Sequence, residues 1–407
     1  MRRQVAIIGG GAAGVFCAIQ LRESSDCQVT IFEKSTELLK KVRISGGGRC
    51  NVTHHFVSQA QFSKNYPRGS KVLKQNFDVF SPEDMTHWLE KRGVRLKTEA
   101  DGRIFPVSND SQTIIDSFIK ELKKHNVAIC FEHELTQIVI ENQKFVLKFN
   151  DKIFTVDYLV IATGGAQKPR DLDIFKPLSL KMVDPVPSLF TFKINDKALT
   201  ELMGLTMQDV SVRIVGTDMK ESGSVLITHW GLSGPGILKL SAWGAFLLNQ
   251  YNYHFQIAIN WMGDSSEEDI RNEIEILRQE NRQAKVRNRK IEKFPQRFWE
   301  YLLVMAEIEA DKKWAELSKK NCNKLIQLLF HSVYEIKGKT TFKEEFVTAG
   351  GIDLEDLNSR TMESKKIPNL YFIGEVTNID GITGGFNFQN AWTSATVCAN
   401  DISNKIN

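Results

Sequence analysis

The stretch Gln4–Glu33, QVAIIGGGAAGVFCAIQLRESSDCQVTIFE, decides the fold of this chain. Its apolar run at Gln4–Ile8 predicts a strand, the 3.6-residue periodicity of 12–22 predicts a helix, and the apolar run at 28–33 predicts a second strand. This order of strand, helix and strand is typical of a parallel sheet covered by helices. We therefore predict an α/β protein that opens with a Rossmann-like unit.

Three glycines, Gly9, Gly11 and Gly14, stand between the first strand and the helix in the spacing G-x-G-x-x-G. The first allows a tight turn, the second lets the backbone approach a pyrophosphate, and the third lets the helix pack closely on the strand. The helix N-terminus then turns its amides toward the phosphates. Glu33, 19 residues after Gly14, can accept hydrogen bonds from an adenosine ribose. The alternative is a glycine-rich packing turn that binds nothing. The residues predicted to hold the adenosine half of a dinucleotide are Gly9, Gly11, Ala12, Ala13, Gly14, Glu33 and Lys34.

Three further glycine-rich segments lie far along the chain, at Ser45–Asn51, Thr163–Gly165 and Gly374–Asn387. In an enzyme that uses NAD the first motif would stand alone, whereas a flavin is held along its whole length by distant segments. Runs of backbone N–H groups can bond a flavin edge where side chains would obstruct it. The segments therefore favour FAD, and the alternative is that they are ordinary turns.

The length of 407 residues, with 42% hydrophobic and 25% charged residues, indicates a soluble globular enzyme of two or three folding units. It excludes a small binding module, a disordered chain and a fibre. Prolines cluster between 169 and 187, charged helical patterns dominate 265–335, and glycine-rich strands return beyond Phe346. We predict an FAD-binding domain of the glutathione-reductase type, interrupted by an insertion. The predicted ranges are 1–187 and 346–407 for the FAD-binding domain, 188–264 and 336–345 for a β-rich domain, and 265–335 for a helical insertion.

The charge and cysteine patterns bear on partners and location. A net charge of +4 over the whole chain does not indicate the concentrated basic face that binds nucleic acid. We interpret the basic run Arg282–Lys293 as a face exposed to solvent. The six cysteines stand singly, which indicates a reducing, cytoplasmic compartment and argues against a structural metal. No apolar stretch is long enough to span a bilayer. We therefore expect a small-molecule substrate and neither a nucleic-acid nor a membrane partner, while the oligomeric state stays undecided.

Five strings carry a resemblance to a known family. They are KVRISGGGRCNVT (41–53), GRIFPV (102–107), THWGLSGPG (228–236), TMESK (361–365) and GEVTNIDGITGGFN (374–387). With them the chain resembles, over nearly its whole length, the YhiN/BaiN-like FAD-dependent flavoproteins, which include aminoacetone oxidase. It departs from their pattern at Thr377-Asn378, where Leu-Asp is expected, and retains Asp380. More distantly, the architecture is similar to that of fumarate-reductase-type flavoproteins.

The resemblance implies which residues hold the cofactor. Leu135 is expected to read the adenine through its backbone, and the segments after Lys41 and Gly374 are expected to flank the ribityl chain and the isoalloxazine. Beyond the adenosine half, the residues assigned to FAD are Lys41, Ser45, Gly46, Gly47, Gly48, Arg49, Cys50, Asn51, Leu135, Thr163, Gly164, Gly165, Gly374, Glu375, Asp380, Gly384, Gly385, Phe386 and Asn387.

Three side chains are the candidates for catalysis: Arg49, His229 and Asn387. An arginine or histidine can polarise a substrate oxygen or nitrogen while a hydride moves. The alternatives are a structural ion pair for Arg49 and a structural role for His229, and Cys50 is interpreted as a buried packing residue.

The predicted function is an FAD-dependent oxidoreductase that transfers a hydride between flavin N5 and a small carbonyl, enone or amine substrate. FAD is expected to be noncovalent, and NAD(P)H is considered as its electron donor. The chain has no second G-x-G-x-x-G after a strand, so NAD(P)H would use the substrate pocket and give ping-pong kinetics. The alternatives are an oxidase that makes hydrogen peroxide from an amine, and an FAD-binding sensor or structural flavoprotein without turnover.

Overall fold

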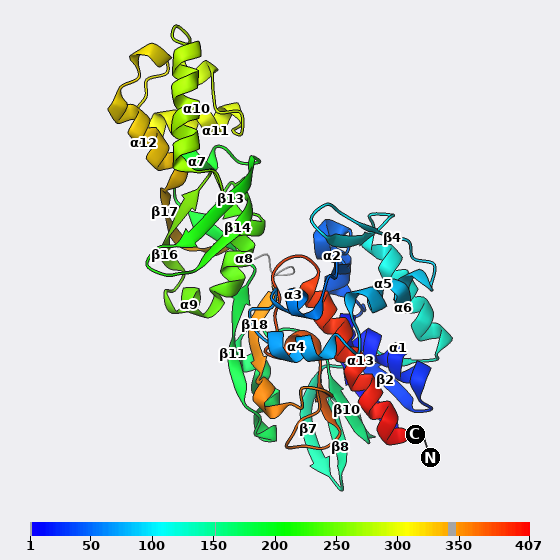
Figure 1. The fold of residues 1–407 in the computed structure, drawn as a ribbon. Coiled ribbons are helices and arrows are strands. Elements are labelled where there is room, and N and C mark those ends of the chain that lie inside the picture. The colour runs from blue at the N-terminus through cyan, green and yellow to red at the C-terminus, as the bar shows by residue number, and fades with distance from the viewer. Residues whose placement is uncertain (1, 151, 341–346) are drawn as a thin grey trace. The chain divides into compact units, whose positions relative to one another are not determined.

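The structure is a computed structural model that describes residues 2–150, 152–340 and 347–407 (Figure 1). The chain divides into two compact units, the first made of Met1–Ser188 with Phe342–Asn407 and the second of Leu189–Thr341. The second unit is thus inserted into the first. The predicted division of the insertion into a β-rich and a helical domain stays a prediction.

The first unit is built on a parallel sheet with the strand order β19-β10-β1-β2-β6. Its central strand β1 pairs in parallel with β2 and β10, and its residues Val5–Ile8 are buried. The five strands are β1 (Gln4–Ile8), β2 (Gln28–Phe32), β6 (Ala128–Cys130), β10 (Tyr158–Ile161) and β19 (Leu370–Phe372). The predicted Rossmann-like sheet is confirmed.

Two long helices form the core of this unit beside the sheet. The N-terminal α1 (Ala12–Ser24) packs along the C-terminal α13 (Phe386–Ile406), so the two ends of the sequence share one core. Phe16 of α1 meets Trp392 of α13 edge to face. The other helices of the unit are α2 (Lys40–Gly48), α3 (Gln59–Ser63), α4 (Ser70–Asn76), α5 (Pro82–Glu90) and α6 (Ser111–Lys124).

The start of α5 follows from its sequence. Ser81 and Asp84 form a reciprocal capping box, and Pro82 occupies the first turn, where its missing N–H is not needed. Asp110 caps α6 by accepting a hydrogen bond from the Gln112 amide. The sequence predicts a helix that starts at Ser81-Pro82 and another that fits 110–124, and both are confirmed.

Smaller elements cover the edges of this unit. Two antiparallel sheets have three strands each, and one has two. The strands are β3 (Thr53–His54), β4 (Leu96–Thr98), β5 (Arg103–Pro106), β7 (Leu135–Glu141), β8 (Lys144–Phe149), β9 (Lys152–Val156), β11 (Met182–Ser188) and β18 (Val347–Ile352). The short 3₁₀ helices are η1 (Pro169–Leu178), η4 (Leu354–Asp356) and η5 (Gly374–Val376). The sequence also predicts a turn at Asn150-Asp151, where Asp151 lies outside the described residues.

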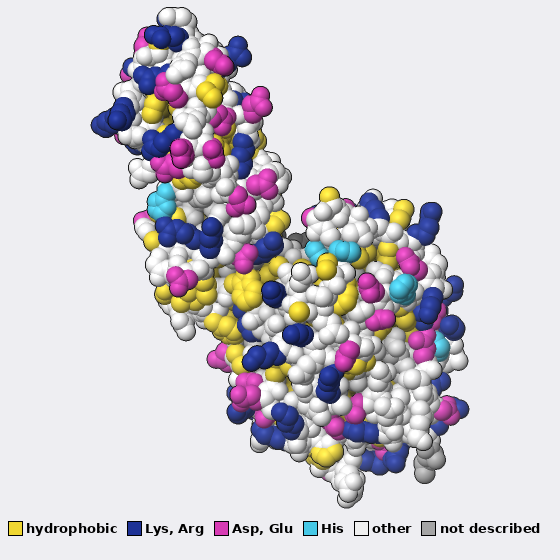
Figure 2. Space-filling model, viewed as in Figure 1, with side chains coloured by type: hydrophobic (Ala, Val, Ile, Leu, Met, Phe, Trp, Pro, Cys, Tyr) yellow, Lys and Arg dark blue, Asp and Glu magenta, His cyan; other side chains and the backbone are white. Residues whose placement is uncertain are grey.

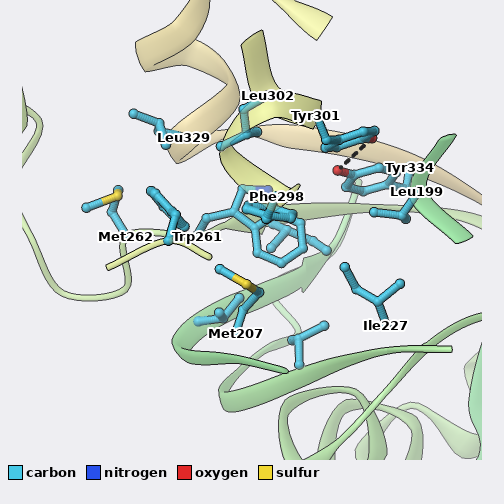
Figure 3. Packing of buried hydrophobic residues seen from close by; sticks show 14 of the residues in the cluster. Leu199, Met207, Ile227, Trp261, Met262, Phe298, Tyr301, Leu302, Leu329 and Tyr334 are labelled. Carbon is cyan, nitrogen blue, oxygen red and sulfur yellow. Dashed lines mark hydrogen bonds between the residues drawn. The ribbon is translucent and has the colours of Figure 1, made fainter. Parts of the chain in front are cut away.

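The second unit joins a closed β-barrel to a group of helices. The barrel strands are β12 (Thr191–Ile194), β13 (Thr206–Ile214), β14 (Lys220–Thr228), β15 (Gly231–Ser233), β16 (His254–Asn260) and β17 (Ser332–Thr340). The helices are α7 (Lys197–Thr200), α8 (Pro235–Trp243), α9 (Ala245–Gln250), α10 (Glu267–Glu280), α11 (Gln296–Met305) and α12 (Lys319–Phe330), with η2 (Val286–Asn288) and η3 (Trp314–Glu316). Side chains of the barrel and of the helices meet in one hydrophobic cluster, in which Trp261, directly after β16, packs on Phe298 of α11 (Figure 3).

Two helix predictions in this unit need correction. The sequence pattern of 235–248 predicts one helix, but the structure has two, because Gly244 ends α8 and begins α9. The pattern of 298–309 predicts another helix, but this helix lies at Gln296–Met305, and the positive φ of Glu307 turns the chain away after it. Among the described residues, no helix combines the length and the apolar character needed to cross a membrane.

Candidate FAD site

The turn after β1 has the geometry that its three glycines predict. Gly9 has φ of +109°, and a Cβ there would lie 2.3 Å from the carbonyl oxygen of Ala162. A Cβ on Gly14 would lie 2.0 Å from the carbonyl oxygen of Gly9, so only glycine lets α1 pack this closely. A Cβ on Gly11 would meet nothing within 4 Å. Gly11 caps α1, so the helix amides open toward this empty space.

Glu33 closes the turn from the end of β2. Its carboxylate accepts hydrogen bonds from the Gly10 amide at 2.7 Å, the Ser35 amide at 2.9 Å and the Ser35 hydroxyl at 2.7 Å. These bonds fix the carboxylate beside the phosphate turn, and its remaining lone pairs can accept from ribose hydroxyls. Ala12 and Ala13 lie in the first turn of α1, and Lys34 is exposed next to Glu33.

The second segment, Ser45–Asn51, overlaps the end of α2, and the backbone dihedral angles of Ser45, Gly46 and Gly47 are not helical. Gly46, Gly47 and Gly48 all have positive φ, and Cβ atoms on the last two would meet nothing within 4 Å. The Oδ1 atom of Asn51 is buried and has no hydrogen-bond partner among the described residues. An open backbone loop that ends in an unsatisfied acceptor is what a ligand with N–H and carbonyl groups would complete.

Cys50 belongs to this loop but has no reactive character. Its side chain is fully buried, and burial raises the pKa of the thiol to about 12. Its φ of +58° places it in the left-handed region, which costs energy for a residue with a Cβ. Cys50 therefore fits the packing role interpreted from the sequence.

The third and fourth segments meet beside Glu375. A Cβ on Gly165 would lie 2.7 Å from Glu375 Oε1, while one on Gly164 would meet nothing within 4 Å. Glu375 accepts from the Thr348 amide at 3.0 Å and pairs with Lys41 Nζ at 2.7 Å. Lys41, Glu375 and the loop of exposed Thr163 are thus brought together from three distant parts of the chain.

The loop from Asp380 to Asn387 is fixed at both ends. Asn387 accepts from the Gly381 amide at 2.8 Å and donates to the Gly381 carbonyl at 2.9 Å. Asp380 is fully buried, where it pairs with Arg68 through both oxygens and accepts from the Ser188 hydroxyl at 3.0 Å. Burial raises the pKa of Asp380 although Arg68 opposes the shift. The side chains of Asp380 and Asn387 therefore shape the loop, and its backbone is left to meet a ligand.

The loop also touches the Ser45–Asn51 segment. A Cβ on Gly385 would lie 2.7 Å from backbone atoms of Thr53 and 2.9 Å from Asn51 Oδ1. The Nδ1 atom of His54 lies 3.0 Å from the carbonyl oxygen of Gly384, within hydrogen-bond distance. The His54 ring also stacks on the ring of Phe386, with 4.8 Å between the ring centres. The sequence reasoning missed His54 and Arg68, because their partners stand more than 300 residues away.

Three predicted residues, Leu135, Arg49 and His229, have surroundings that the glycine-rich turns do not determine. Leu135 begins β7, which pairs with β8 in a sheet separate from the parallel one. Arg49 pairs with Glu99 at 2.7 Å and its guanidinium lies 4.0 Å from the centre of the Phe105 ring. His229 is exposed in the turn between β14 and β15 of the second unit, so its proposed role rests on the sequence.

Among the described residues, Glu23, Glu121 and His125 are close enough together to suggest a metal site. Arg92 pairs with both carboxylates, and a guanidinium would repel a cation there. We interpret this cluster as an ion-pair network between α1 and α6.

Two observations indicate that the glycine-rich loops can hold a dinucleotide such as FAD. Gly11, Gly47, Gly48 and Gly164 line open space in which side chains would stand, and Asn51 offers a buried acceptor without a partner. The turns after β1, β10 and β19 also lie at the carboxyl ends of parallel strands, where such sheets bind ligands.

Fold and site together define a flavoprotein oxidoreductase with a Rossmann FAD-binding fold. Over residues 3–401 the sequence matches the family described as HI0933-like protein Rossmann domain, and the chain belongs to that family. The resemblance drawn from the five strings is thereby confirmed.

Curated relatives match along nearly their whole length. The ribosomal RNA dihydrouridine synthase of Escherichia coli (strain K12) is 30% identical, with 98% of each chain covered. The 3-dehydro-bile acid delta(4,6)-reductase of Clostridium scindens is 24% identical, over 96% of this chain and 97% of the relative.

Solved structures share the fold at low identity. A 3-ketosteroid delta1-dehydrogenase from Sterolibacterium denitrificans gives a TM-score of 0.52 at 11% identity, with 98% of this chain and 99% of that chain covered. An open flavocytochrome c3 fumarate reductase gives 0.51 at 14% identity, with 100% and 78% covered. The predicted distant similarity to fumarate-reductase-type flavoproteins is confirmed at the level of fold.

Proposed function

We propose that this flavoprotein reduces a carbon–carbon double bond conjugated to a carbonyl group. The observation that carries the proposal is the chemistry shared by the two kinds of curated relative. Dihydrouridine is uridine with its C5–C6 double bond saturated, beside the C4 carbonyl, and a delta(4,6)-reductase acts on double bonds conjugated to the 3-ketone. Both reactions add a hydride to the carbon of the double bond that lies farther from the carbonyl group, which is the β carbon in uracil and in a 4-ene and the δ carbon in a 6-ene, and a proton to the nearer carbon.

FAD, when bound without a covalent link, supplies the hydride from its N5. The backbone loops of Gly11, Gly47 and Gly164 leave the space for it, and Asn51 Oδ1 offers an acceptor to the ring. Asn387 acts as a positioning residue, because both of its amide atoms hold Gly381.

Arg49 is the proposed electrophile. Its guanidinium is held by Glu99 and lies against Phe105, and its side chain is 32% exposed, so it can reach a ligand. Arg103 bonds the second Glu99 oxygen at 3.2 Å and steadies the pair. A positive group that stays protonated at neutral pH can stabilise the charge that grows on a substrate carbonyl as the hydride arrives.

The proton for the α carbon has one candidate donor from the sequence, His229. An imidazole can donate a proton to a reacting carbon as a general acid. Cys50 does not suit this task, because its raised pKa and burial keep the thiol protonated and away from solvent.

NAD(P)H is the proposed reductant. Bound FAD would carry the hydride from NAD(P)H to the substrate, and His229, the proposed donor, would supply one proton taken up from solvent. Substrate, NAD(P)H and H⁺ thus give the saturated product and NAD(P)⁺. The six cysteines, all free thiols in the structure, support the proposal of a cytoplasmic location.

Two candidate substrates carry a double bond conjugated to a carbonyl group, namely a uracil base in RNA and a small enone. The expectation of a small-molecule substrate and no nucleic-acid partner rested on the net charge and stays untested. The greater identity and coverage of the ribosomal RNA enzymes favour the uracil base.

Product analysis tests the proposal. The FAD-loaded protein is incubated under argon with NADPH labelled with deuterium on its transferable position, together with either a uridine-rich RNA or a 4,6-dienone steroid. The proposal expects a saturated product that carries deuterium at the β carbon of the uracil, or at the β or δ carbon of the steroid according to which double bond is reduced. An unchanged substrate with hydrogen peroxide formed from an amine in air would support the oxidase instead, and no turnover under any condition would support a binding protein.

A further inference from the structure

The segment from Lys34 to Asn76 is far more basic than the rest of the chain. It holds nine lysines and arginines against one acidic residue, Glu37, a net charge of +8 in a protein whose total is +4. The basic run Arg282–Lys293 singled out earlier lies in the second unit and is partly neutralised, for example by the pair of Arg287 with Glu300 at 3.1 Å.

Part of this charge is used inside the FAD site. Lys41, Arg49 and Arg68 pair with Glu375, Glu99 and Asp380. Three lysines are exposed here: Lys64, which follows the last residue of α3, and Lys71 and Lys74 of α4. In the described part of the chain no carboxylate pairs with them. Figure 2 shows Lys and Arg side chains over the face where these two helices lie.

A surface hollow of about 400 Å³ opens on this face. The residues that line it all have polar or charged side chains: Gln59, Lys71, Lys74, Gln75, Asp78 and Arg360. Arg360 neutralises Asp78 at 3.0 Å, which leaves the two lysines as the unbalanced charges. Lysines can contact phosphates, and glutamine amides can both donate to and accept from ribose hydroxyls. The volume lies in the range of about 300–1,000 Å³ that is typical of ligand clefts.

The helices that carry this face are fastened to the candidate FAD site. Gly69, which begins α4, is so close to Ile379 that a Cβ would lie 2.5 Å from its side chain, and the preceding Arg68 pairs with Asp380. Phe62 of α3 packs on Phe386 at 5.0 Å. A strand of nucleic acid held in the hollow would therefore lie at a fixed distance from the loop Asp380–Asn387.

We propose that the face of α3 and α4 around Lys71 and Lys74, here called the lysine face, binds the phosphate backbone of single-stranded RNA and so presents a uracil base to the flavin. This rests on the proposed reduction of a conjugated double bond. RNA is preferred to other polyanions because its bases carry such a bond and its ribose hydroxyls match the glutamines.

The test measures binding apart from turnover. A fluorescein-labelled, uridine-containing single-stranded RNA is titrated with the FAD-loaded protein, and anisotropy is recorded across a series of salt concentrations. The charge reversal Lys71→Glu with Lys74→Glu is compared with Lys120→Glu with Lys123→Glu, a pair with the same three-residue spacing exposed on α6. Both double variants change the net charge equally, so only position distinguishes them.

The logarithm of the binding constant falls linearly with the logarithm of the salt concentration, and each phosphate contact to single-stranded RNA contributes about 0.7 to the steepness of this slope. The lysine-face variant loses two contacts, so its slope is expected to be shallower by about 1.4 and its affinity at least tenfold lower. The α6 variant is expected to stay within about twofold of the wild type, and arginine at both positions is expected to restore binding. Equal losses in both variants, no RNA binding by the wild type, or binding only to vesicles of anionic lipid would overturn the proposal.

Reoxidation of the reduced flavin by a small enone is measured on the same samples. It is expected to be unchanged in both double variants, because neither pair belongs to the FAD site. RNA binding lost without any effect on this reaction separates the lysine face from the chemistry. A wild type that reduces the enone but ignores RNA refutes the lysine face alone, whereas a wild type that reduces neither substrate refutes the proposed function.

Discussion

Gly11 offers a substitution that separates cofactor binding from folding. Gly11 has φ of −80°, a value open to any residue, and a Cβ there meets nothing within 4 Å. Gly14, in the same motif, would place a Cβ 2.0 Å from the Gly9 carbonyl oxygen. We expect Gly11→Val to fold but to bind no FAD, because its methyl groups occupy the space reserved for the pyrophosphate. We expect Gly14→Val to fail to fold.

The magnitudes follow from the environment of each glycine. Replacing a glycine N-cap by an apolar residue costs about 1 kcal/mol, which lowers the Tm of the apoprotein by about 2–4 °C for a unit of this size. FAD at 100 times its Kd stabilises the wild type by about 2.7 kcal/mol, which corresponds to a rise of about 5–11 °C. The variant is expected to show none of this rise.

Differential scanning fluorimetry with and without FAD measures both effects, and the absorption spectrum of the purified protein reports the bound flavin. The wild type is expected to be yellow and to release intact FAD on heating, and the variant colourless but cooperatively folded. A yellow Gly11→Val protein with an FAD-dependent Tm would refute the assignment of this turn to the pyrophosphate. A colourless wild type that cannot be reconstituted would refute the cofactor itself.

Three other predictions follow from single side chains. Asn51→Leu removes a buried acceptor that has no protein partner, so the apoprotein is expected to keep its Tm while FAD affinity falls by about fivefold to tenfold; unchanged FAD affinity would place Asn51 outside the site. The Lys181 amide and the Lys366 ammonium lower the pKa of Asp356 below the usual 3.8. The stability that Asp356 contributes is therefore complete above pH 3.8 and lost as the pH falls through the lowered value. Asp356→Asn should accordingly flatten the acid limb of a plot of unfolding free energy against pH, and an identical acid limb would contradict this. His229→Ala is expected to slow turnover by about two to four orders of magnitude with an unaltered FAD spectrum if His229 donates the proton, and normal turnover would return it to a structural role.

The sequence predicted the parts of the fold that depend on local signals. The βαβ opening, the capped helices after Ser81 and Asp110, and the glycine-rich turns follow from periodicity, capping and backbone freedom within a few residues. Family resemblance supplied the assignment of FAD to the distant segments. Gly244, by contrast, splits a helix that the apolar pattern predicts as continuous, because its neighbours Leu240 and Leu248 are both buried.

The sequence could not predict contacts between distant segments. Arg68 and Asp380 stand 312 residues apart, and no periodicity marks them as a pair. The closure of the six-stranded barrel likewise depends on β12 meeting both β15 and β17, which local patterns do not encode. The role of Asn387 depends on the hydrogen bonds between its amide and Gly381, which the sequence does not encode, since an asparagine in the string Gly-Gly-Phe-Asn can equally face a ligand.

The central claim is that electrons pass through the flavin to a conjugated double bond. Rapid mixing of the reduced, FAD-loaded protein with three acceptors tests it most directly: a uridine-containing RNA and a 4,6-dienone steroid under argon, and air-saturated buffer. Recovery of the oxidised flavin absorbance reports electron transfer in each case. We predict fast reoxidation by the RNA or the dienone, with a saturated product, and slow reoxidation by oxygen. Fast reoxidation by oxygen alone, with hydrogen peroxide as the product, would contradict the account.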